Sequence, residues 1–135
     1  MENMKELVKS FYTKCLTVNS DTNLPEFTNQ LLDDNFLSIN AKETKSKQIL
    51  IGQLQYFWKL IPDLKWEPKE IIQEGNQVVV RSEFSGSPIG EFMGLNLNGS
   101  KSFKTMSIDI HTVENGKIVE IYHIEEWGTA IEQLK

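Results

Sequence analysis

Residues 107–127, SIDIHTVENGKIVEIYHIEEW, contain both histidines of the chain, His111 and His123. Each histidine has a carboxylate two positions away, Asp109 before the first and Glu125 after the second. Residues two apart on a strand point to the same side of a sheet, so each histidine shares a face with its carboxylate. Whether the two pairs lie on one common face depends on the turn between them.

The turn sequence, Glu114-Asn115-Gly116, is compatible with two registers. A two-residue turn at Asn115-Gly116 pairs Glu114 with Lys117 and puts the histidines on opposite faces. A three-residue loop pairs Val113 with Lys117 instead, and it sets His111 opposite Val119 and Ser107 opposite His123. This loop collects on one face the residues Ser107, Asp109, His111, His123, Glu125 and Trp127. The other face then carries Met106, Ile108, Ile110, Ile118, Tyr122 and Ile124. We predict the three-residue loop, because it separates polar from apolar residues better.

Composition limits the classes of function. The chain has 135 residues, the usual size of one domain, and we expect a single domain over residues 1–135. A net charge of −5 and a single arginine argue against nucleic acid as a partner, because nucleic acid requires a dense basic surface. No apolar segment is long enough to span a membrane, and Cys15 has no second cysteine to pair with. We therefore expect a cytoplasmic protein.

Hydrophobic spacing predicts helices in the first part of the chain and strands in the rest. Apolar residues recur every three or four positions up to Pro62 and mostly every second position after it. The predicted helices cover residues 2–18, 24–31 and 46–61, with a final helical turn at 128–134. The predicted strands cover residues 36–39, 64–73, 77–87, 101–113 and 117–127, with a looser segment at 87–100. Pro68 predicts an edge strand or a bulge. This order predicts an α+β fold with three N-terminal helices packed on a curved, mostly antiparallel sheet.

The polar face of the last two strands has two interpretations. It is either a solvated sheet face or the wall of a pocket that carries proton-transfer groups, because histidine and carboxylates are the usual general acids and bases. Two histidines and a carboxylate could also bind a metal ion, but the spacing does not resemble that of zinc proteases. We expect neither a metal ion nor a cofactor.

Several segments, in this order, resemble those of the SnoaL-like polyketide cyclases. They are Pro62-Asp63-Leu64, GEFMG at 90–94, SIDI at 107–110, NGKIVE at 115–120 and YHIEEW at 122–127. This family is part of the superfamily that includes nuclear transport factor two and ketosteroid isomerase. The resemblance covers nearly the whole chain. It implies a cone-shaped α+β barrel with a deep cavity at its open end.

The resemblance also implies a site. In the cyclases a histidine and an acid two residues later perform acid–base catalysis, and these match His123 and Glu125. His111 matches a histidine of the preceding strand, and Asp109 matches a residue that points into the cavity. The family acid is aspartate, whereas this chain has glutamate, with Glu126 next to it as a second candidate. We expect the substrate-binding residues to be Trp127, Asn40, Phe57, Trp58, Phe92 and Met93, the last two on a loop that closes the cavity.

The resemblance thus implies a cofactor-free cyclase that acts on a small hydrophobic carbonyl compound. The substrate would lose a proton next to its carbonyl group, and the enolate would close a ring by intramolecular aldol attack. Glu125 would move the proton with His123, and Asp109 and His111 would hydrogen-bond the carbonyl oxygens. A non-catalytic module that binds a small molecule in the same cavity is the alternative. The family commonly pairs through the outer sheet face, which is apolar here, so we also expect a homodimer.

Overall fold

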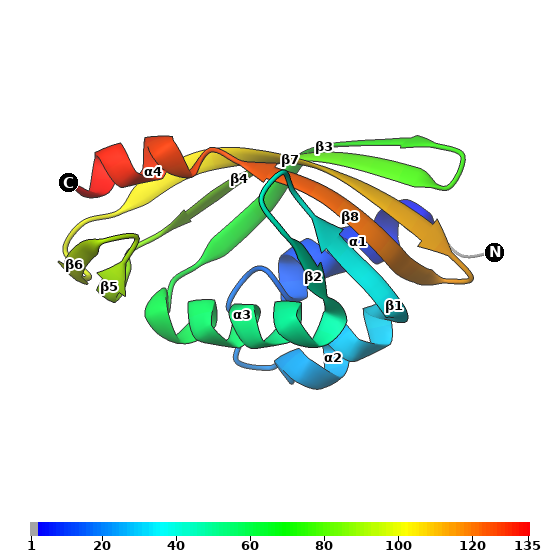
Figure 1. Cartoon of the computed structure of the whole chain (residues 1–135), viewed down its shortest axis with the longest axis horizontal. Helices are drawn as coiled ribbons and strands as arrows, with labels where there is room; N and C mark the ends of the chain where they lie inside the picture. The colour runs from blue at the N-terminus through cyan, green and yellow to red at the C-terminus, as the bar shows by residue number, and fades with distance from the viewer. Residues whose placement is uncertain (1–2) are drawn as a thin grey trace.

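The computed structural model describes residues 3–135 and has the predicted α+β architecture (Figure 1). Its helices are α1 (Met4–Lys14), α2 (Leu24–Leu31), α3 (Lys47–Leu60) and α4 (Trp127–Leu134). Its strands are β1 (Leu32–Ile39), β2 (Thr44–Ser46), β3 (Lys65–Glu74), β4 (Gln77–Gly86), β5 (Ile89–Phe92), β6 (Leu95–Asn98), β7 (Phe103–Glu114) and β8 (Lys117–Glu125). The predicted start of the first helix, at residue 2, lies outside the described residues.

The main sheet has the strand order β2-β1-β8-β7-β4-β3. Its neighbouring strands are antiparallel except for β1 and β8, which run parallel. The sheet curves over α1, α2 and α3, whereas α4 and the β5–β6 hairpin lie toward one end (Figure 1). The concave face of the sheet therefore looks onto the N-terminal helices, and its convex face looks away from them.

The helices begin where capping residues predict. The side chains of Asn23 and Ser46 accept hydrogen bonds from backbone N–H groups in the first turns of α2 and α3. The first helix ends at Lys14, four residues earlier than predicted. The chain leaves the helix there because it hydrogen-bonds to the start of β3. The Thr17 hydroxyl accepts from the Trp66 N–H at 2.9 Å, and the Val18 N–H donates to Leu64 O at 3.0 Å.

Two segments that looked irregular in the sequence form strands. Residues 89–98, part of the predicted loose segment, form the β5–β6 hairpin. Its turn is Met93-Gly94, with φ angles of 50° and 83°. The three polar residues at 33–35 lie within β1, where the pairing with β8 is irregular. Pro68 occupies the edge strand β3 next to a register shift, as predicted.

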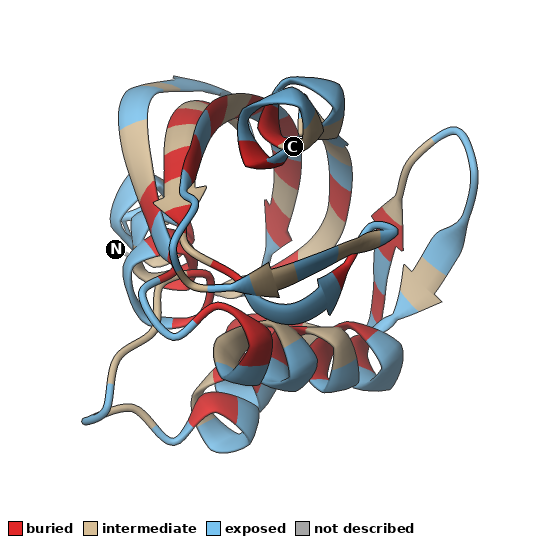
Figure 2. Ribbon diagram, turned by 90° about the vertical axis from the view of Figure 1, so that its left-hand side faces the viewer, coloured by how far each residue is buried: buried red, intermediate tan, exposed pale blue. Residues whose placement is uncertain are grey.

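The core lies between the concave face and the helices. Buried and exposed residues alternate along the strands, most regularly in β4 and β7, and the helices turn their buried sides toward the sheet (Figure 2). Aromatic rings dominate one end of this core. Trp66 stacks on Phe84 with ring centroids 3.9 Å apart, and Phe84 meets Trp127 edge-on at 5.0 Å.

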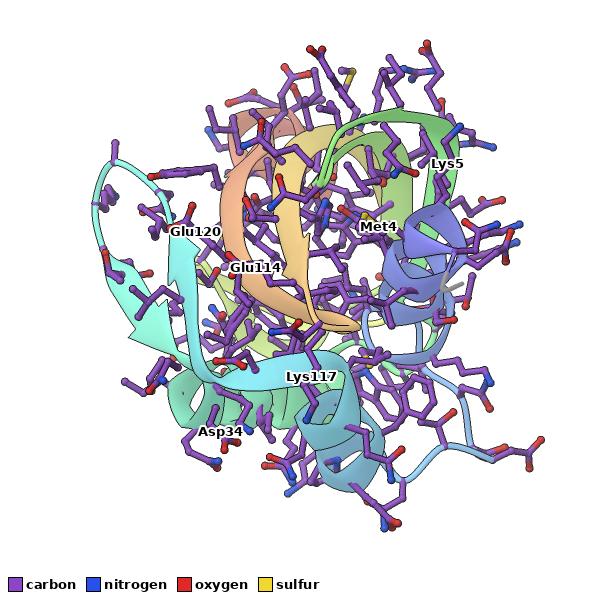
Figure 3. All side chains as sticks on the ribbon, turned by 90° about the vertical axis from the view of Figure 1, so that its right-hand side faces the viewer. Met4, Lys5, Asp34, Glu114, Lys117 and Glu120 are labelled. Atoms are coloured by element: carbon purple, nitrogen blue, oxygen red, sulfur yellow. The ribbon has the colours of Figure 1, made fainter. Side chains whose placement is uncertain are left out.

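The turn between β7 and β8 has two residues, so the predicted three-residue loop is wrong. Glu114 pairs with Lys117 (both are labelled in Figure 3). Val113 pairs with Ile118. Asn115 and Gly116, at the centre of the turn, have φ angles of 51° and 75°. Positive φ at both positions gives a turn whose twist matches that of the flanking strands, which favours Asn-Gly over a longer loop.

A bulge in β8 nevertheless restores the predicted face for the histidines. Val113 pairs with Ile118 but Thr112 pairs with Glu120, so Val119 is an extra residue on β8. Beyond the bulge the parity changes by one residue. On the turn side of the bulge, Ile118 pairs with Val113 on the inner face, where Ile118 is fully buried, so its predicted place on the outer face is wrong.

The pairing beyond the bulge differs in detail from the prediction. Asp109 lies opposite His123, and Ser107 lies opposite Glu125 instead of His123. His111 lies opposite Ile121 instead of Val119. All four members of the two histidine–carboxylate pairs thus come to line the concave side of the sheet.

Candidate active site

A cavity of about 80 Å³, measured as space for the centres of water-sized spheres, lies between the concave face and helices α1 and α3. This volume is several times the roughly 10–15 Å³ that a single water requires on the same measure. Most of the cavity wall is apolar, and its histidines and carboxylates all come from β7 and β8. The lining residues are Phe11, Tyr12, Leu16, Ser38, Lys45, Leu50, Gln53, Leu54, Phe57, Trp66, Asp109, His111, Ile121, His123, Glu125 and Trp127.

A buried hydrogen-bonded chain joins β7 to the first helix. The Tyr12 hydroxyl lies 2.7 Å from Asp109 Oδ2 and 2.9 Å from His111 Nε2. His111 Nδ1 lies 2.9 Å from the carbonyl oxygen of Val78. Because a carbonyl oxygen can only accept, His111 Nδ1 carries a hydrogen and donates it. Both ring nitrogens of His111 therefore have partners within the protein.

Burial controls the protonation states of Tyr12, Asp109 and His111. Desolvation lowers the pKa of His111 to about 4, so its imidazole is neutral at neutral pH. Desolvation also raises the pKa of Asp109 to about 7. The pKa of Tyr12 is raised well above its usual value of 10 by burial and by the neighbouring Asp109. An aspartic acid that titrates near neutrality is suited to exchange protons with a ligand.

A second polar pair comes from β8. His123 Nδ1 donates to Glu125 Oε2 at 2.7 Å, and both side chains are mostly buried. The hydrogen bond with Glu125 raises the pKa of His123, although burial opposes this shift. Glu125 thus orients the imidazole and stabilises its protonated form, and it leaves Nε2 facing away from the pair.

Two buried polar atoms of these groups have no hydrogen-bond partner within residues 3–135. They are Asp109 Oδ1 and His123 Nε2. The two residues lie directly opposite each other on neighbouring strands, and both line the cavity. An unpartnered buried polar atom costs free energy unless a ligand or water satisfies it. The two residues therefore offer two unpartnered polar atoms to whatever occupies the cavity.

The sequence did not single out Lys45 and Gln53. Lys45 Nζ donates to Gln53 Oε1 at 2.8 Å and forms an ion pair with Glu43 at 3.1 Å, and its side chain is only 12% exposed. Lys45 lies on β2, a three-residue strand that hydrophobic spacing cannot reveal. A buried tyrosine in a helix is a stronger signal, because its hydroxyl requires a partner, and Tyr12 could have been found in this way.

Of the predicted substrate-binding residues, some line the cavity and the others do not. Trp127 and Phe57 line the cavity. Phe92 is buried next to them, with its ring 5.7 Å from that of Trp127 and 6.4 Å from that of Phe57, so it supports the wall from behind. Met93 is 42% exposed at the tip of the β5–β6 hairpin.

The other two predicted substrate-binding residues contact the backbone. Asn40 Oδ1 accepts hydrogen bonds from the N–H groups of Lys42 and Glu43, which makes it a turn residue. Trp58 Nε1 donates to the carbonyl oxygen of Cys15 at 2.9 Å. Neither side chain is among those that line the cavity.

The two adjacent glutamates have different positions. Glu125 lines the cavity, whereas Glu126 is exposed and precedes α4 as its N-terminal cap position. Over the described part of the chain, no three His, Cys, Asp or Glu side chains form a group that could hold a metal ion. None of the helices in residues 3–135 is long and apolar enough to cross a membrane.

Comparisons with known proteins agree with this architecture. The sequence matches the family model for SnoaL-like polyketide cyclases over residues 6–134. No curated protein matches it significantly. Among solved structures, IdmH from Streptomyces antibioticus, a candidate polyketide cyclase, is 21% identical with a TM-score of 0.82, over 98% of this chain and 99% of that one.

Two further structures are similar. A candidate SnoaL-like polyketide cyclase from Jannaschia sp. CCS1 is 16% identical with a TM-score of 0.84, over 97% of this chain and 90% of that one. A candidate polyketide cyclase from Bacillus cereus ATCC 10987 is 23% identical with a TM-score of 0.72, over 97% of this chain and 77% of that one. At these identities the structural likeness establishes the fold.

Proposed function

The chain belongs to the SnoaL-like polyketide cyclase family, and we propose that it is a cofactor-free enzyme that enolises a hydrophobic carbonyl compound and closes a ring within it. The reaction class is an intramolecular aldol addition. The substrate occupies the cavity between the concave face and α3, and the reacting groups are those of β7 and β8.

One observation carries this proposal. Asp109 Oδ1 and His123 Nε2 are buried, lack a partner within the described chain and lie at paired positions on adjacent strands. Apolar pockets with a few convergent polar groups are typical of small-molecule sites. Proton transfer next to a carbonyl group requires a base within reach of the substrate, a role that His123 Nε2 can fill, while Asp109 Oδ1 gives the substrate a second polar contact.

The His123–Glu125 pair supplies the base. His123 Nε2 takes the proton from the carbon next to the carbonyl group, and Glu125 stabilises the imidazolium that forms. The electron pair of the broken C–H bond gives the enolate, whose carbon attacks a second carbonyl group of the same molecule. The resulting alkoxide takes the proton back from His123, so no net proton is consumed. Proton transfer by a positioned side chain is typically worth ~10² to 10⁴-fold in rate.

The apolar walls contribute to catalysis by excluding water and by holding the substrate in one conformation. Phe57, Trp127 and Trp66 exclude water from the polar groups, which strengthens the electrostatic interactions between them and the substrate. The same walls hold a flexible chain in the folded conformation that brings its two carbonyl groups together.

Assembly and location are proposed on separate grounds. We propose a homodimer that covers the exposed apolar residues of the outer face of β7 and β8, because an apolar patch of this kind favours association in water. We propose a cytoplasmic location, because the only cysteine, Cys15, is a buried free thiol.

A direct test is to identify the small molecules that copurify with the protein and to incubate the complex. An enzyme converts the bound compound to an isomer, or to a product that has lost water, with an unchanged carbon count. A bound compound that stays unchanged, together with no turnover of linear poly-β-ketone esters, would favour the non-catalytic binding module instead.

A further inference from the structure

The Tyr12 hydroxyl has one hydrogen but two close polar neighbours. Its oxygen lies 2.7 Å from Asp109 Oδ2 and 2.9 Å from His111 Nε2. A phenol donates one hydrogen bond and accepts others. Tyr12 therefore donates to one neighbour and must accept from the other. The positions of the hydrogens among Tyr12, Asp109 and His111 can be deduced from this rule.

The His111 side of the chain is determined by its second contact. His111 Nδ1 donates to the Val78 carbonyl oxygen, so a neutral His111 has a bare lone pair at Nε2. The ring is fully buried, and charging it there is unfavourable. Tyr12 then donates to His111 Nε2, and its oxygen must accept from Asp109 Oδ2. Asp109 is accordingly a neutral acid with its hydrogen on Oδ2, directed at the Tyr12 oxygen.

The alternative proton distribution leads to the same result for the cavity. If Asp109 is ionised and His111 is protonated at both nitrogens, Nε2 donates to Tyr12 and Tyr12 donates to Asp109 Oδ2. Asp109 Oδ1 is then a carboxylate oxygen without a hydrogen. A hydrogen on Oδ1 would require Tyr12 to donate to Oδ2, and a neutral His111 would lose its only partner at Nε2. In both arrangements that satisfy the hydrogen bonds of Tyr12 and His111, the unpartnered oxygen Oδ1 is an acceptor.

We propose that Asp109 Oδ1 selects ligands that present a hydroxyl hydrogen to it, such as an enol or a phenol, and that Tyr12 and His111 impose this selection as positioning residues. This inference rests on the proposed function only in taking the cavity as the ligand site. It reverses the expectation that Asp109 donates to a carbonyl oxygen. A carbonyl oxygen is placed instead at His123 Nε2 when that imidazole is protonated.

The surroundings of Asp109 are consistent with a neutral hydroxyl as the group that it selects. Glu125 is paired with His123, and Lys45 is paired with Glu43, so the charged groups near the cavity are matched within the protein. The enol form of a 1,3-dicarbonyl compound carries a hydroxyl donor beside a carbonyl acceptor. One such molecule can satisfy both Asp109 Oδ1 and a protonated His123.

The test uses two ligands of nearly equal size, phenol and fluorobenzene, which differ in having a hydroxyl donor. Each is titrated into the full chain at neutral pH, and binding is followed by the NMR signals of the Trp127 indole and the His123 ring. Phenol should bind about tenfold more tightly, as expected for one hydrogen bond to an otherwise unpaired buried acceptor. Equal affinity of the two ligands, with both in the cavity, would overturn the inference and leave the proposed enzyme standing.

Two variants separate positioning from packing. In Asp109→Asn the amide NH₂ can donate to Tyr12 while its oxygen faces the cavity, so the preference for phenol should persist. In Tyr12→Phe the hydrogen of Asp109 is no longer held on Oδ2, so the preference should fall to within about twofold while benzaldehyde gains affinity. A Tyr12→Phe protein that folds and keeps the full preference would contradict the role of Tyr12.

A measurement on the parent protein does not depend on any variant. The ¹⁵N signals of His111 should show hydrogen on Nδ1 and none on Nε2 at neutral pH. Hydrogen on Nε2 alone would overturn the inference. A preference for phenol without any enolisation of ketones would, in contrast, uphold the inference and refute the proposed reaction.

Discussion

In an ordinary sheet the buried face is apolar and the exposed face is polar. Strands β7 and β8 carry buried polar residues on their concave face and exposed apolar residues on their convex face. On the concave face of β7 and β8, Asp109 is 4% exposed and His111 is fully buried. On the convex face, Tyr122 is 50% exposed and Ile124 is 72% exposed. Burial of polar groups normally costs free energy, and exposure of large apolar groups gains none. The proposed enzyme and the proposed homodimer account for both features, because a ligand in the cavity would meet the inner polar groups and a second copy would cover the outer apolar ones.

The difference between the faces also shows how register determines function. A single extra residue, Val119, separates a hairpin in which the two histidines share a face from one in which they do not. Without the bulge, the two-residue turn would place His123 and Glu125 on the side opposite to Asp109. The candidate site therefore depends on an irregularity that lies four residues before His123 along β8.

The largest effect is expected on the concave face, in catalysis. Glu125→Gln retains the shape of the side chain but removes the charge that stabilises a protonated His123. Turnover of a carbonyl substrate should fall by roughly 10²-fold or more, with ligand affinity changed only a few-fold. Glu126→Gln is the matched control, because Glu126 is exposed next to it. A loss of turnover in Glu126→Gln alone would transfer the role to that residue.

The next effect concerns the convex face. Ile124→Lys places a charge in the centre of the proposed dimer contact, which should weaken the dimer by roughly 10²-fold or more, as expected from the loss of one buried isoleucine in each of the two copies. Ile49→Lys is the control, because Ile49 is similarly exposed, at 58%, but lies on α3. Light scattering reports the mass of each protein. A parent protein with a mass near 15.5 kDa would refute the dimer altogether.

A smaller, pH-dependent effect distinguishes Asp109 from the outer residues. Burial raises the pKa of Asp109 from 3.8 to about 7, so between these values the folded protein holds a proton that the unfolded chain has lost. The contribution of Asp109 to stability therefore falls as pH rises through this window, by at most about 1.4 kcal/mol per pH unit. Asp109→Asn cannot titrate at this position. From pH 4 to pH 7, the free energy of unfolding of the parent should therefore fall relative to that of Asp109→Asn.

Denaturant unfolding of both proteins at several pH values measures this difference. His111, whose pKa is lowered to about 4, changes stability in the opposite direction, but it is present in both proteins and largely cancels. A constant difference in stability between the two proteins across the window would mean that Asp109 is ionised throughout.

The smallest effect is expected for an ion pair on the exposed side of the sheet. Arg81 Nε donates to Glu70 at 2.6 Å, but the two side chains are 36% and 59% exposed. Exposed pairs contribute at most about 1 kcal/mol, so Arg81→Gln should lower the free energy of unfolding by no more than that. An Arg81→Gln protein destabilised by several kcal/mol would show that the outer surface is more ordered than its exposure indicates.

The parts of the fold that follow from local rules were predictable from the sequence. Asn23 and Ser46 cap their helices, and Pro68 marks a fault in an edge strand, because each acts through its immediate neighbours. The bulge at Val119 and the short strand β2 were not predictable, since both depend on pairing between segments distant in the sequence. The partners of Asp109 were missed for the same reason, because Tyr12 is 97 residues away.

The central claim is that the concave face removes a proton next to a carbonyl group. The most direct measurement is the rate at which deuterium from D₂O enters the methyl group of acetophenone, followed by NMR with and without the protein. The account predicts that the parent protein accelerates this exchange and that Glu125→Gln loses at least roughly 10²-fold of the acceleration, while Glu126→Gln retains it. Acetophenone that binds in the cavity but exchanges no faster than in buffer would contradict it.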